Sequence, residues 1–278
     1  MTTAMAQDKY LNINGLRLHY LDWGNDGHKP MLLLHGFMAH AHIWDGFASK
    51  FRCYYHVMAL DQRGHGESQW SKEGAYTIED HFIDLDNFTE TLGLRNLIFV
   101  GHSMGGRNAL FYAAYNSDNI ERLILVDARP GNNPGSSEAL RHLINKLPLQ
   151  GNSIDEVAQQ VQAIYPYLSW RMCYHIASYG YKQVHKGKLV PKYDVRMCLP
   201  LEHSGYSTDD LWHLMKNVTC PTLVVRGKES PFLSRQEAKN MCKVLPEAEW
   251  REIPKSTHMP AQENSVAFNK AILGFLNR

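Results

Sequence analysis

Apolar and polar residues alternate on both sides of Asn14-Gly15, over residues 10–13 and 16–20. This alternation around a two-residue turn predicts an antiparallel β-hairpin. Further along the chain, four short runs consist almost entirely of apolar residues, which is typical of parallel strands that are buried on both faces. These runs lie at residues 31–34, 56–60, 97–100 and 123–126.

Helical patterns separate the buried runs. One pattern covers residues 78–92, with Thr77 as a cap at its start and Gly93 at its end, and another covers residues 106–115. Because strands and helices alternate, the sequence predicts an α/β fold, in which a doubly wound and mostly parallel sheet carries helices on both faces.

The alternation stops after residue 129. Residues 130–217 contain a turn-rich stretch and helical patterns at 154–164 and 167–179, but no buried strand. We therefore expect one core, formed by residues 1–129 and 218–278, with a helical cap of residues 130–217 inserted after strand six. Open α/β sheets bind ligands at the carboxyl ends of their strands, and we expect the cap to lie there as a lid. In the second part of the core the sequence predicts strands at 222–225 and 249–253, a helix at 235–245, and a final helix ending near Phe275.

Charge and composition argue against several classes of protein. The 29 Lys and Arg residues nearly balance the 28 Asp and Glu residues, so the formal charge of +1 provides no field to hold nucleic acid or an anionic membrane. Five scattered cysteines without a C-x-x-C spacing argue against a disulfide framework. The apolar runs are far shorter than the ~20 residues that cross a bilayer, and residues 1–10 do not resemble a secretion signal. We expect a cytoplasmic protein without a membrane span; homo-oligomerisation stays open.

The strongest chemical signal is Gly101-His102-Ser103-Met104-Gly105-Gly106, a G-x-S-x-G motif between a buried run and a helical pattern. A strand, a sharp turn and a helix are the setting in which a nucleophilic serine is lifted clear of the backbone, and glycines are needed where that turn is crowded. The attack of Ser103 on a carbonyl requires donors for the oxyanion. The backbone N–H groups of Phe37, in His35-Gly36-Phe37, and of Met104 are the candidates.

These motifs resemble those of the α/β-hydrolase superfamily, and the resemblance covers nearly the whole chain outside the insertion. His35-Gly36-Phe37, residues 61–68, the serine motif and a late His258 occur in the family's order. The resemblance implies that His258, after the last predicted strand, is the general base. It also implies that Asp61 and Arg63 hold loops together and take no part in catalysis.

The acid departs from the commonest family pattern. After strand seven, where most members carry an aspartate, this chain reads Gly227-Lys228-Glu229-Ser230. Some members, including certain small bacterial esterases, carry the acid after strand six, where this chain has Asp127. We expect Asp127 to orient His258, with Glu229 as the alternative. The resemblance makes Ser230 an auxiliary residue that hydrogen-bonds the base beside the acid after strand six.

The expected activity is hydrolysis of a small carboxylic ester, with a short to medium acyl or an aryl group, through an acyl-enzyme on Ser103. Carbon–carbon bond hydrolysis and perhydrolysis on the same fold stay open, as does a ligand-binding protein without turnover. We expect no cofactor and no metal, because His40 and His42 form a lone H-x-H pair without a third ligand. The aromatic-rich residues 164–181 form either a pocket for an apolar group or the core of the cap.

Overall fold

The computed structural model describes residues 6–131, 134–184, 187–198 and 205–278. Within them, eight strands form one sheet in the order β1-β2-β4-β3-β5-β6-β9-β10. β2 is antiparallel to both of its neighbours, and every other adjacent pair in the sheet is parallel. The strands are β1 (Gln7–Ile13), β2 (Leu16–Asp22), β3 (Pro30–Leu34), β4 (His56–Leu60), β5 (Leu97–His102), β6 (Ile120–Val126), β9 (Thr222–Gly227) and β10 (Ala248–Ile253).

The hairpin at the start of the sheet follows from its turn residues. Asn14 and Gly15 have φ angles of 51° and 76°, and two central residues with positive φ are what a tight two-residue turn between twisted strands requires. The turn pairs Ile13 with Leu16, and the register continues to Gln7 opposite Asp22. The predicted hairpin is confirmed.

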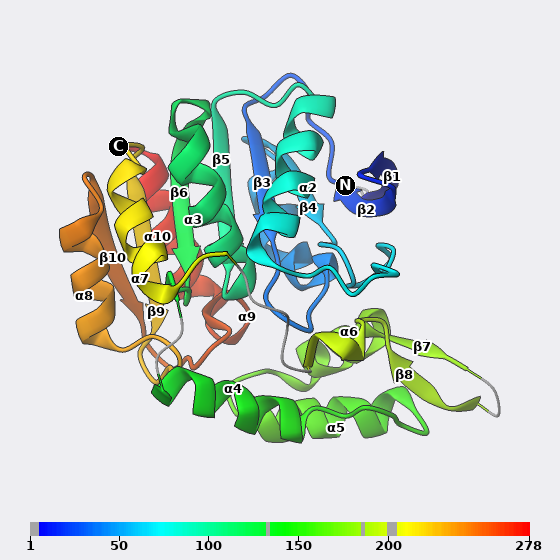
Figure 1. The fold of residues 1–278 in the computed structure, drawn as a ribbon. Coiled ribbons are helices and arrows are strands. Elements are labelled where there is room, and N and C mark those ends of the chain that lie inside the picture. Colours follow the sequence, from blue (N-terminus) through cyan, green and yellow to red (C-terminus); the bar gives the residue numbers. More distant parts are fainter. Residues whose placement is uncertain (1–5, 132–133, 185–186, 199–204) are drawn as a thin grey trace.

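Helices cover both faces of the sheet (Figure 1), and an apolar cluster lies under each layer. One cluster joins the sheet to α2, α3 and α8, and the other joins it to α1 and α10. Two buried faces explain why the central strands read as continuous apolar runs. The helices of the core are α1 (Asp45–Phe51), α2 (Ile78–Thr91), α3 (Met104–Asn116), α8 (Arg235–Val244), α9 (Pro260–Glu263) and α10 (Ser265–Leu276), with the short 3₁₀ helices η1 (Ala41–Trp44) and η2 (Ser117–Asn119).

α2 begins where the sequence predicts. The Thr77 hydroxyl accepts a hydrogen bond from the Asp80 N–H at 3.2 Å, and the Asp80 carboxylate accepts one from the Thr77 N–H at 2.8 Å. This reciprocal pair satisfies two backbone donors that a helix start otherwise leaves unpaired. Gly93, with φ of 62°, follows the end of the helix.

The elements from the end of β6 to residue 198 lie along the sheet edge formed by the carboxyl ends of the strands (Figure 1). Their apolar residues form a cluster of their own, which Met259 joins from the core. The insertion also contains a short antiparallel hairpin, where the sequence analysis predicts no buried strand. The inserted elements are α4 (Pro134–Lys146), α5 (Ile154–Ile164), α6 (Trp170–Gly180), β7 (Tyr181–Gln183), β8 (Leu189–Pro191) and the 3₁₀ helix η4 (Val195–Cys198).

The last part of the predicted cap belongs to a different layer. α7 (Thr208–Leu214) and the 3₁₀ helix η5 (Met215–Asn217) pack against α3 through Leu211, which contacts Phe111, and through Met215 in the core cluster. In Figure 1, α7 accordingly stands beside the sheet and not with α4 and α5. Residues 208–217, which the sequence analysis assigns to the cap, are therefore placed with the helices of the core.

Some expectations concern residues outside the described ranges. They include the first half of the N-terminal segment, residues 1–5, and positions 132–133 of the turn-rich stretch. Across the part of the chain that the structure describes, no helix combines the length and the apolar character that crossing a membrane demands.

Candidate active site

Ser103 lies between β5 and α3 in a backbone conformation that few non-glycine residues adopt, with φ of 52° and ψ of −116°. The neighbouring glycines allow this turn. A Cβ at Gly101 would come within 2.4 Å of the Gly105 carbonyl oxygen, and a Cβ at Gly105 within 2.5 Å of the His35 carbonyl oxygen. α3 begins at Met104, directly after the serine, so the side chain of Ser103 stands at the start of the helix.

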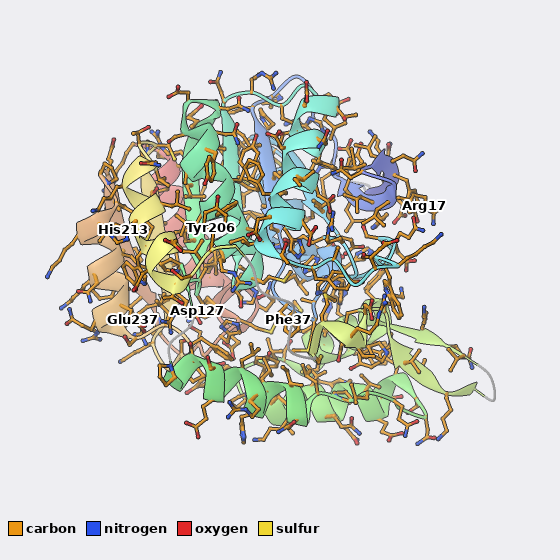
Figure 2. The ribbon with its side chains drawn as sticks, in the orientation of Figure 1. Arg17, Phe37, Asp127, Tyr206, His213 and Glu237 are labelled. Atoms are coloured by element: carbon orange, nitrogen blue, oxygen red, sulfur yellow. The ribbon has the colours of Figure 1, made fainter. Side chains whose placement is uncertain are left out.

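His258 connects Ser103 to Asp127. Its Nε2 atom lies 3.0 Å from the Ser103 hydroxyl oxygen, and its Nδ1 atom lies 2.7 Å from the Oδ2 atom of Asp127. The three residues come from the ends of β5 and β6 and from the loop after β10. Asp127 and His258 are almost completely buried. In Figure 2, Asp127 lies at the sheet edge that faces the inserted helices. The fold thus brings together the three residues predicted as catalytic.

The Asp127 carboxylate is held by two further donors. Its Oδ1 atom accepts the Gly227 N–H at 3.0 Å, and its Oδ2 atom accepts the Ser230 hydroxyl at 2.5 Å. The Ser230 oxygen accepts the N–H groups of Phe232 and Leu233, so its proton is left to point at Asp127. The prediction that Ser230 hydrogen-bonds the base is therefore corrected: among the described residues its hydroxyl donates to the acid, because the loop after β9 turns it toward Asp127.

Glu229, the alternative acid, points elsewhere. Its carboxylate accepts a short hydrogen bond from the Tyr167 hydroxyl of the inserted segment, and the residue is exposed. The Nδ1 atom of His258 is already bonded to Asp127. The geometry thus gives the orienting position to Asp127.

Comparisons with known proteins place the fold among known ones. The family model for the alpha/beta hydrolase fold matches residues 29–164. The 2-(acetamidomethylene)succinate hydrolase of Mesorhizobium japonicum is 25% identical over 247 residues, which are 89% of this chain and 87% of that protein. The crystal structure of E-2-(acetamidomethylene)succinate hydrolase superposes with a TM-score of 0.88 at 23% identity, covering 98% of this chain and 100% of that one. The chain has the α/β-hydrolase fold.

Other relatives of this α/β-hydrolase are hydrolases as well. The N-formylmaleamate deformylase of Pseudomonas putida is 35% identical over 144 residues, which are 52% of this chain and 52% of that protein. The human monoacylglycerol lipase ABHD6 is 25% identical over 289 residues, which are 99% of this chain and 83% of that protein. These relatives support an enzymatic hydrolase.

Three residues that the sequence analysis did not assign fix the position of His258 in the hydrolase. The His102 Nε2 atom lies 2.6 Å from the His258 carbonyl oxygen, and burial holds the pKa of His102 well below its usual range, so the neutral ring donates this bond. The Phe232 ring lies against the His258 ring, with centroids 4.0 Å apart. The Glu263 carboxylate accepts the N–H groups of Thr257 and Met259, the two residues that flank the base.

A polar network shapes the loop after β3, where the sequence places an oxyanion donor. A Cβ at Gly36 would lie 2.7 Å from His102 Nδ1 and 3.2 Å from Ser103 Cβ, so this glycine lets the loop pass directly beside the serine. Met38, with φ of 60°, donates its N–H to His65 Nε2 at 3.1 Å. Phe37 lies at the same sheet edge as Asp127 (Figure 2). That the N–H groups of Phe37 and Met104 bind the oxyanion stays a prediction.

Asp61 and Arg63 have the loop-holding contacts that the family resemblance implies. The Asp61 carboxylate accepts the backbone N–H of Ala41 at 2.6 Å and that of Glu67 at 3.0 Å. Arg63 binds both oxygens of Asp84, at 2.6 and 2.7 Å. These contacts hold the loops after β3 and β4 in place, at the same edge of the sheet as Ser103.

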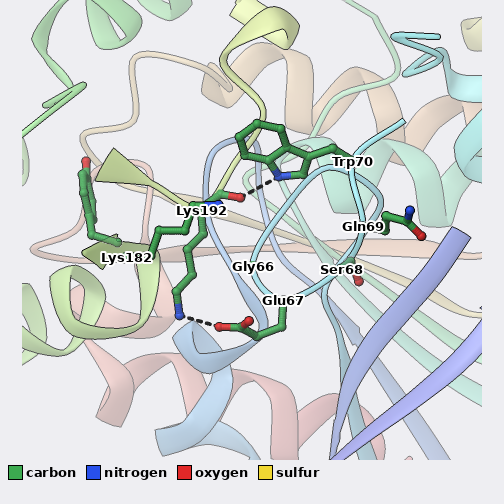
Figure 3. A pocket seen from close by; sticks show the side chains of 8 residues that line it. Gly66, Glu67, Ser68, Gln69, Trp70, Lys182 and Lys192 are labelled. Carbon is green, nitrogen blue, oxygen red and sulfur yellow. Dashed lines mark hydrogen bonds and ion pairs between the residues drawn. The ribbon is translucent and has the colours of Figure 1, made fainter. Parts of the chain in front are cut away.

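A groove between the core and the inserted hairpin lies outside the triad (Figure 3). There Trp70 donates its indole N–H to the Lys192 carbonyl oxygen at 2.9 Å, and the Lys192 ammonium pairs with Glu67 at 2.5 Å. The Lys182 ammonium lies 5.0 Å from the centre of the Trp70 ring. The contacts dock β7 and β8 on the core. The residues that line the groove are Gly66, Glu67, Ser68, Gln69, Trp70, Tyr181, Lys182 and Lys192.

The aromatic-rich stretch of the inserted segment divides into two sets. Tyr181 is buried and Tyr165 partly buried in the cluster at the centre of the inserted elements, together with the apolar Leu168. Other aromatic residues of the stretch are between 38% and 44% exposed, which places them at the surface. They are Tyr167, Trp170, Tyr174 and Tyr179.

Proposed function

We propose that the chain is a serine hydrolase that transfers the acyl group of a small carboxylic ester to Ser103 and then to water. The observation that carries the proposal is the hydrogen-bonded series from Ser103 Oγ through His258 to Asp127, with contacts of 3.0 and 2.7 Å. A serine, an imidazole and a carboxylate in this order are the components of nucleophilic acyl transfer.

In the proposed reaction, Ser103 Oγ attacks the carbonyl carbon while His258 Nε2 takes the hydroxyl proton. The carbonyl oxygen becomes an oxyanion, which the N–H groups of Phe37 and Met104 bind. His258 then gives the proton to the leaving alcohol as the carbon–oxygen bond breaks. A water molecule, deprotonated by His258, attacks the acyl-enzyme, and the proton returns to Ser103 as the acid leaves.

Asp127 stabilises the imidazolium that forms in each step. Its carboxylate accepts hydrogen bonds from Gly227 and Ser230 in addition to His258, so it is held in place while the proton moves between serine, histidine and product. It also fixes the ring with Nδ1 protonated and Nε2 free to accept.

The names of two relatives favour a second candidate, an acyl amide as the substrate. They are the 2-(acetamidomethylene)succinate hydrolase and the N-formylmaleamate deformylase. The same three residues would act, with the proton of His258 delivered to a nitrogen in place of an oxygen. The two reactions would use the same nucleophile and would differ in how the site binds the leaving group.

The test is a panel of 4-nitrophenyl esters from acetate to decanoate, together with the matching 4-nitroanilides and a vinylogous 1,5-diketone that reports carbon–carbon cleavage. We expect turnover of the short and medium esters, and its loss in Ser103→Ala. Turnover of the anilides or of the diketone without turnover of any ester would assign the protein to one of those reactions. Binding of the esters with no turnover at all would contradict the enzyme and favour a ligand-binding protein.

A further inference from the structure

Two histidines and an aspartate meet where the inserted segment contacts the core, on elements that are far apart in the sequence. His42 lies in η1, Asp45 is the first residue of α1, and His175 lies on α6. The Asp45 Oδ2 atom is 2.9 Å from His42 Nδ1 and 3.2 Å from His175 Nε2. The three potential ligand atoms lie within 4.8 Å of one another.

We propose that His42, Asp45 and His175 bind a divalent cation of the zinc class and that this ion ties the inserted segment to the core. Neutral imidazole and carboxylate are the ligands that Zn²⁺ accepts, and two histidines with one carboxylate are a known donor set for it. An ion bound at about 2.0–2.2 Å needs ligand atoms roughly 3.5 Å apart. The contacts of this cluster require only small movements to reach that spacing.

The hydrogen bonding of Asp45 supports a cation at this place. Its Oδ2 atom accepts from both histidines, whereas its Oδ1 atom is buried and has no hydrogen-bond partner among the described residues. A buried carboxylate oxygen without a partner is costly, because it has lost its water and gained nothing. A cation bound by both carboxylate oxygens of Asp45 would remove that cost.

A second cluster with similar residue types lacks this property. Asp22, Asp26 and His56 also lie close together. The Lys9 ammonium lies 2.5 Å from Asp22 Oδ2, and the Gly24 N–H donates to Asp22 Oδ1 at 2.8 Å. Since the protein supplies its own cation there and both oxygens are satisfied, that cluster has no need of an ion.

The two imidazole rings are held in place by their surroundings. The His42 ring stacks on Tyr179, with centroids 3.7 Å apart and planes at 22°. Tyr179 lies one turn after His175 on α6, so one face of that helix provides both a ligand and the support for the other ligand. All three ligand residues are partly exposed, which leaves a path for the ion and for water as a fourth ligand.

Binding replaces the present hydrogen bonds of the cluster. The rings now share Asp45 Oδ2, and His175 Nε2 also contacts the His42 carbonyl oxygen at 2.9 Å. With the ion bound, the ring protons lie on the opposite nitrogens, Nε2 of His42 and Nδ1 of His175, and the lone pairs face the metal. Because α6 belongs to the inserted segment, the bound ion opposes its movement away from the core.

The experiment is calorimetric titration of the EDTA-treated full chain with ZnCl₂, followed by the absorption spectrum of the Co²⁺ form. We expect one equivalent to bind, a visible band typical of tetrahedral Co²⁺, and a higher melting temperature with zinc. His175→Gln and Asp45→Asn keep the size and polarity of the side chains, and we expect each to weaken binding about 100-fold or more and to remove the rise in melting temperature.

Three variants separate this site from other ligands of the chain. His142→Ala removes an exposed histidine of α4, Cys53→Ser removes an exposed thiol, and His258→Gln removes the imidazole beside Ser103. We expect all three to bind zinc as the unchanged protein does. Unchanged binding in His175→Gln and Asp45→Asn, loss of binding in His258→Gln instead, or no binding by the folded full chain would each overturn the proposal.

Discussion

At the scale of single residues, the orientation of Asp127 explains how the proposed site works. The backbone of Asp127 has φ of 45° and donates its N–H to the Val225 carbonyl oxygen at 2.7 Å, which turns the side chain out of the end of β6. Gly227, the last residue of β9, and Ser230, in the loop after it, then bind its carboxylate oxygens. Two neighbouring strands thus place one carboxylate against His258.

Replacing the two carboxylates tests which of them is the acid. We expect Asp127→Asn to lower kcat by about 10³- to 10⁴-fold, because an amide neither stabilises the imidazolium nor fixes the ring as a carboxylate does. Glu229→Gln is the matched change at an exposed neighbour of the site, and we expect it to leave kcat within about twofold. Steady-state ester hydrolysis measures both. The reverse order of effects would transfer the role of the acid to Glu229.

Ser230 contributes less to catalysis than Asp127, and a second substitution measures its contribution. Ser230→Ala removes the hydroxyl donor of Asp127, and a hydrogen bond to a charged group contributes about 1.5–3 kcal/mol. We expect kcat to fall about tenfold and KM to change little, since Ser230 acts through Asp127. An equal loss in the double variant Ser230→Ala/Asp127→Asn and in Asp127→Asn alone would agree with this role. A tenfold further loss in the double variant would contradict it.

At the scale of elements, the serine turn requires the start of α3 to lie very close to β5 and to Ala128, just after β6. A Cβ at Gly106 would come within 2.4 Å of the Ala128 Cβ and 2.7 Å of the Gly101 carbonyl oxygen. We expect Gly106→Ala to push the start of α3 outward, to destabilise the fold by about 1–3 kcal/mol and to reduce ester hydrolysis. Denaturant unfolding and kinetics measure the two effects.

Gly274→Ala is the control for that substitution. Gly274 also lies inside a helix, α10, and a Cβ there would meet no atom within 4 Å. Alanine favours the helix over glycine, so we expect this variant to be more stable by about 0.5–1 kcal/mol. If Gly106→Ala were equally stabilising, the close contact of α3 with Gly101 and Ala128 would not exist in solution.

Local patterns predicted the sheet and most helices because each of those elements carries its own signal. The bounds of β4 and α5 agree with the sequence prediction, and α2 is confirmed to within one residue. β7 and β8 were missed because three residues each are too few to show an alternation. The position of α7 beside the core depends on its packing against α3, and no local sequence pattern predicts that packing.

The residues of the candidate site also differ in how far the sequence alone predicts them. Ser103 stands in a motif of adjacent residues, and the sequence order implied His258. The sequence left Asp127 and Glu229 open, because only the path of the loop after β9 decides which carboxylate faces the base. His175 could not be paired with His42 from the sequence at all, because they are 133 residues apart and meet only through the docking of α6.

At the scale of the whole molecule, a buried ion pair ties β2 to the loop after β4. His19 Nδ1 lies 2.7 Å from Asp61 Oδ2, and both side chains are buried. Burial by itself would lower the pKa of His19, but the hydrogen bond and charge of Asp61 outweigh it, so its pKa is raised. Burial by itself would raise the pKa of Asp61. The hydrogen bond with His19 outweighs burial, so the pKa of Asp61 is held below its usual range.

These shifts make the stability depend on pH. The pKa of His19 is higher in the folded state than in the unfolded state, where it is about 6.5. The His19–Asp61 pair therefore stabilises the fold fully at pH values below the unfolded pKa, and this stabilisation is lost as the pH rises through the folded pKa. We therefore expect His19→Gln to lower the free energy of unfolding most at pH 5.5 to 6, and less as the pH rises toward 9. Urea unfolding of both proteins over this range measures the difference. A difference that stays constant with pH would contradict a charged His19.

The central claim is that Ser103 is a nucleophile activated by His258, and covalent labelling tests it most directly. A fluorophosphonate probe reacts with an activated serine, and mass spectrometry of the digested protein locates the adduct. We expect one adduct per chain, on Ser103, formed at least about 10³-fold more slowly in folded His258→Gln and absent from Ser103→Ala. An adduct on another residue, or ester hydrolysis that persists in Ser103→Ala, would contradict the account.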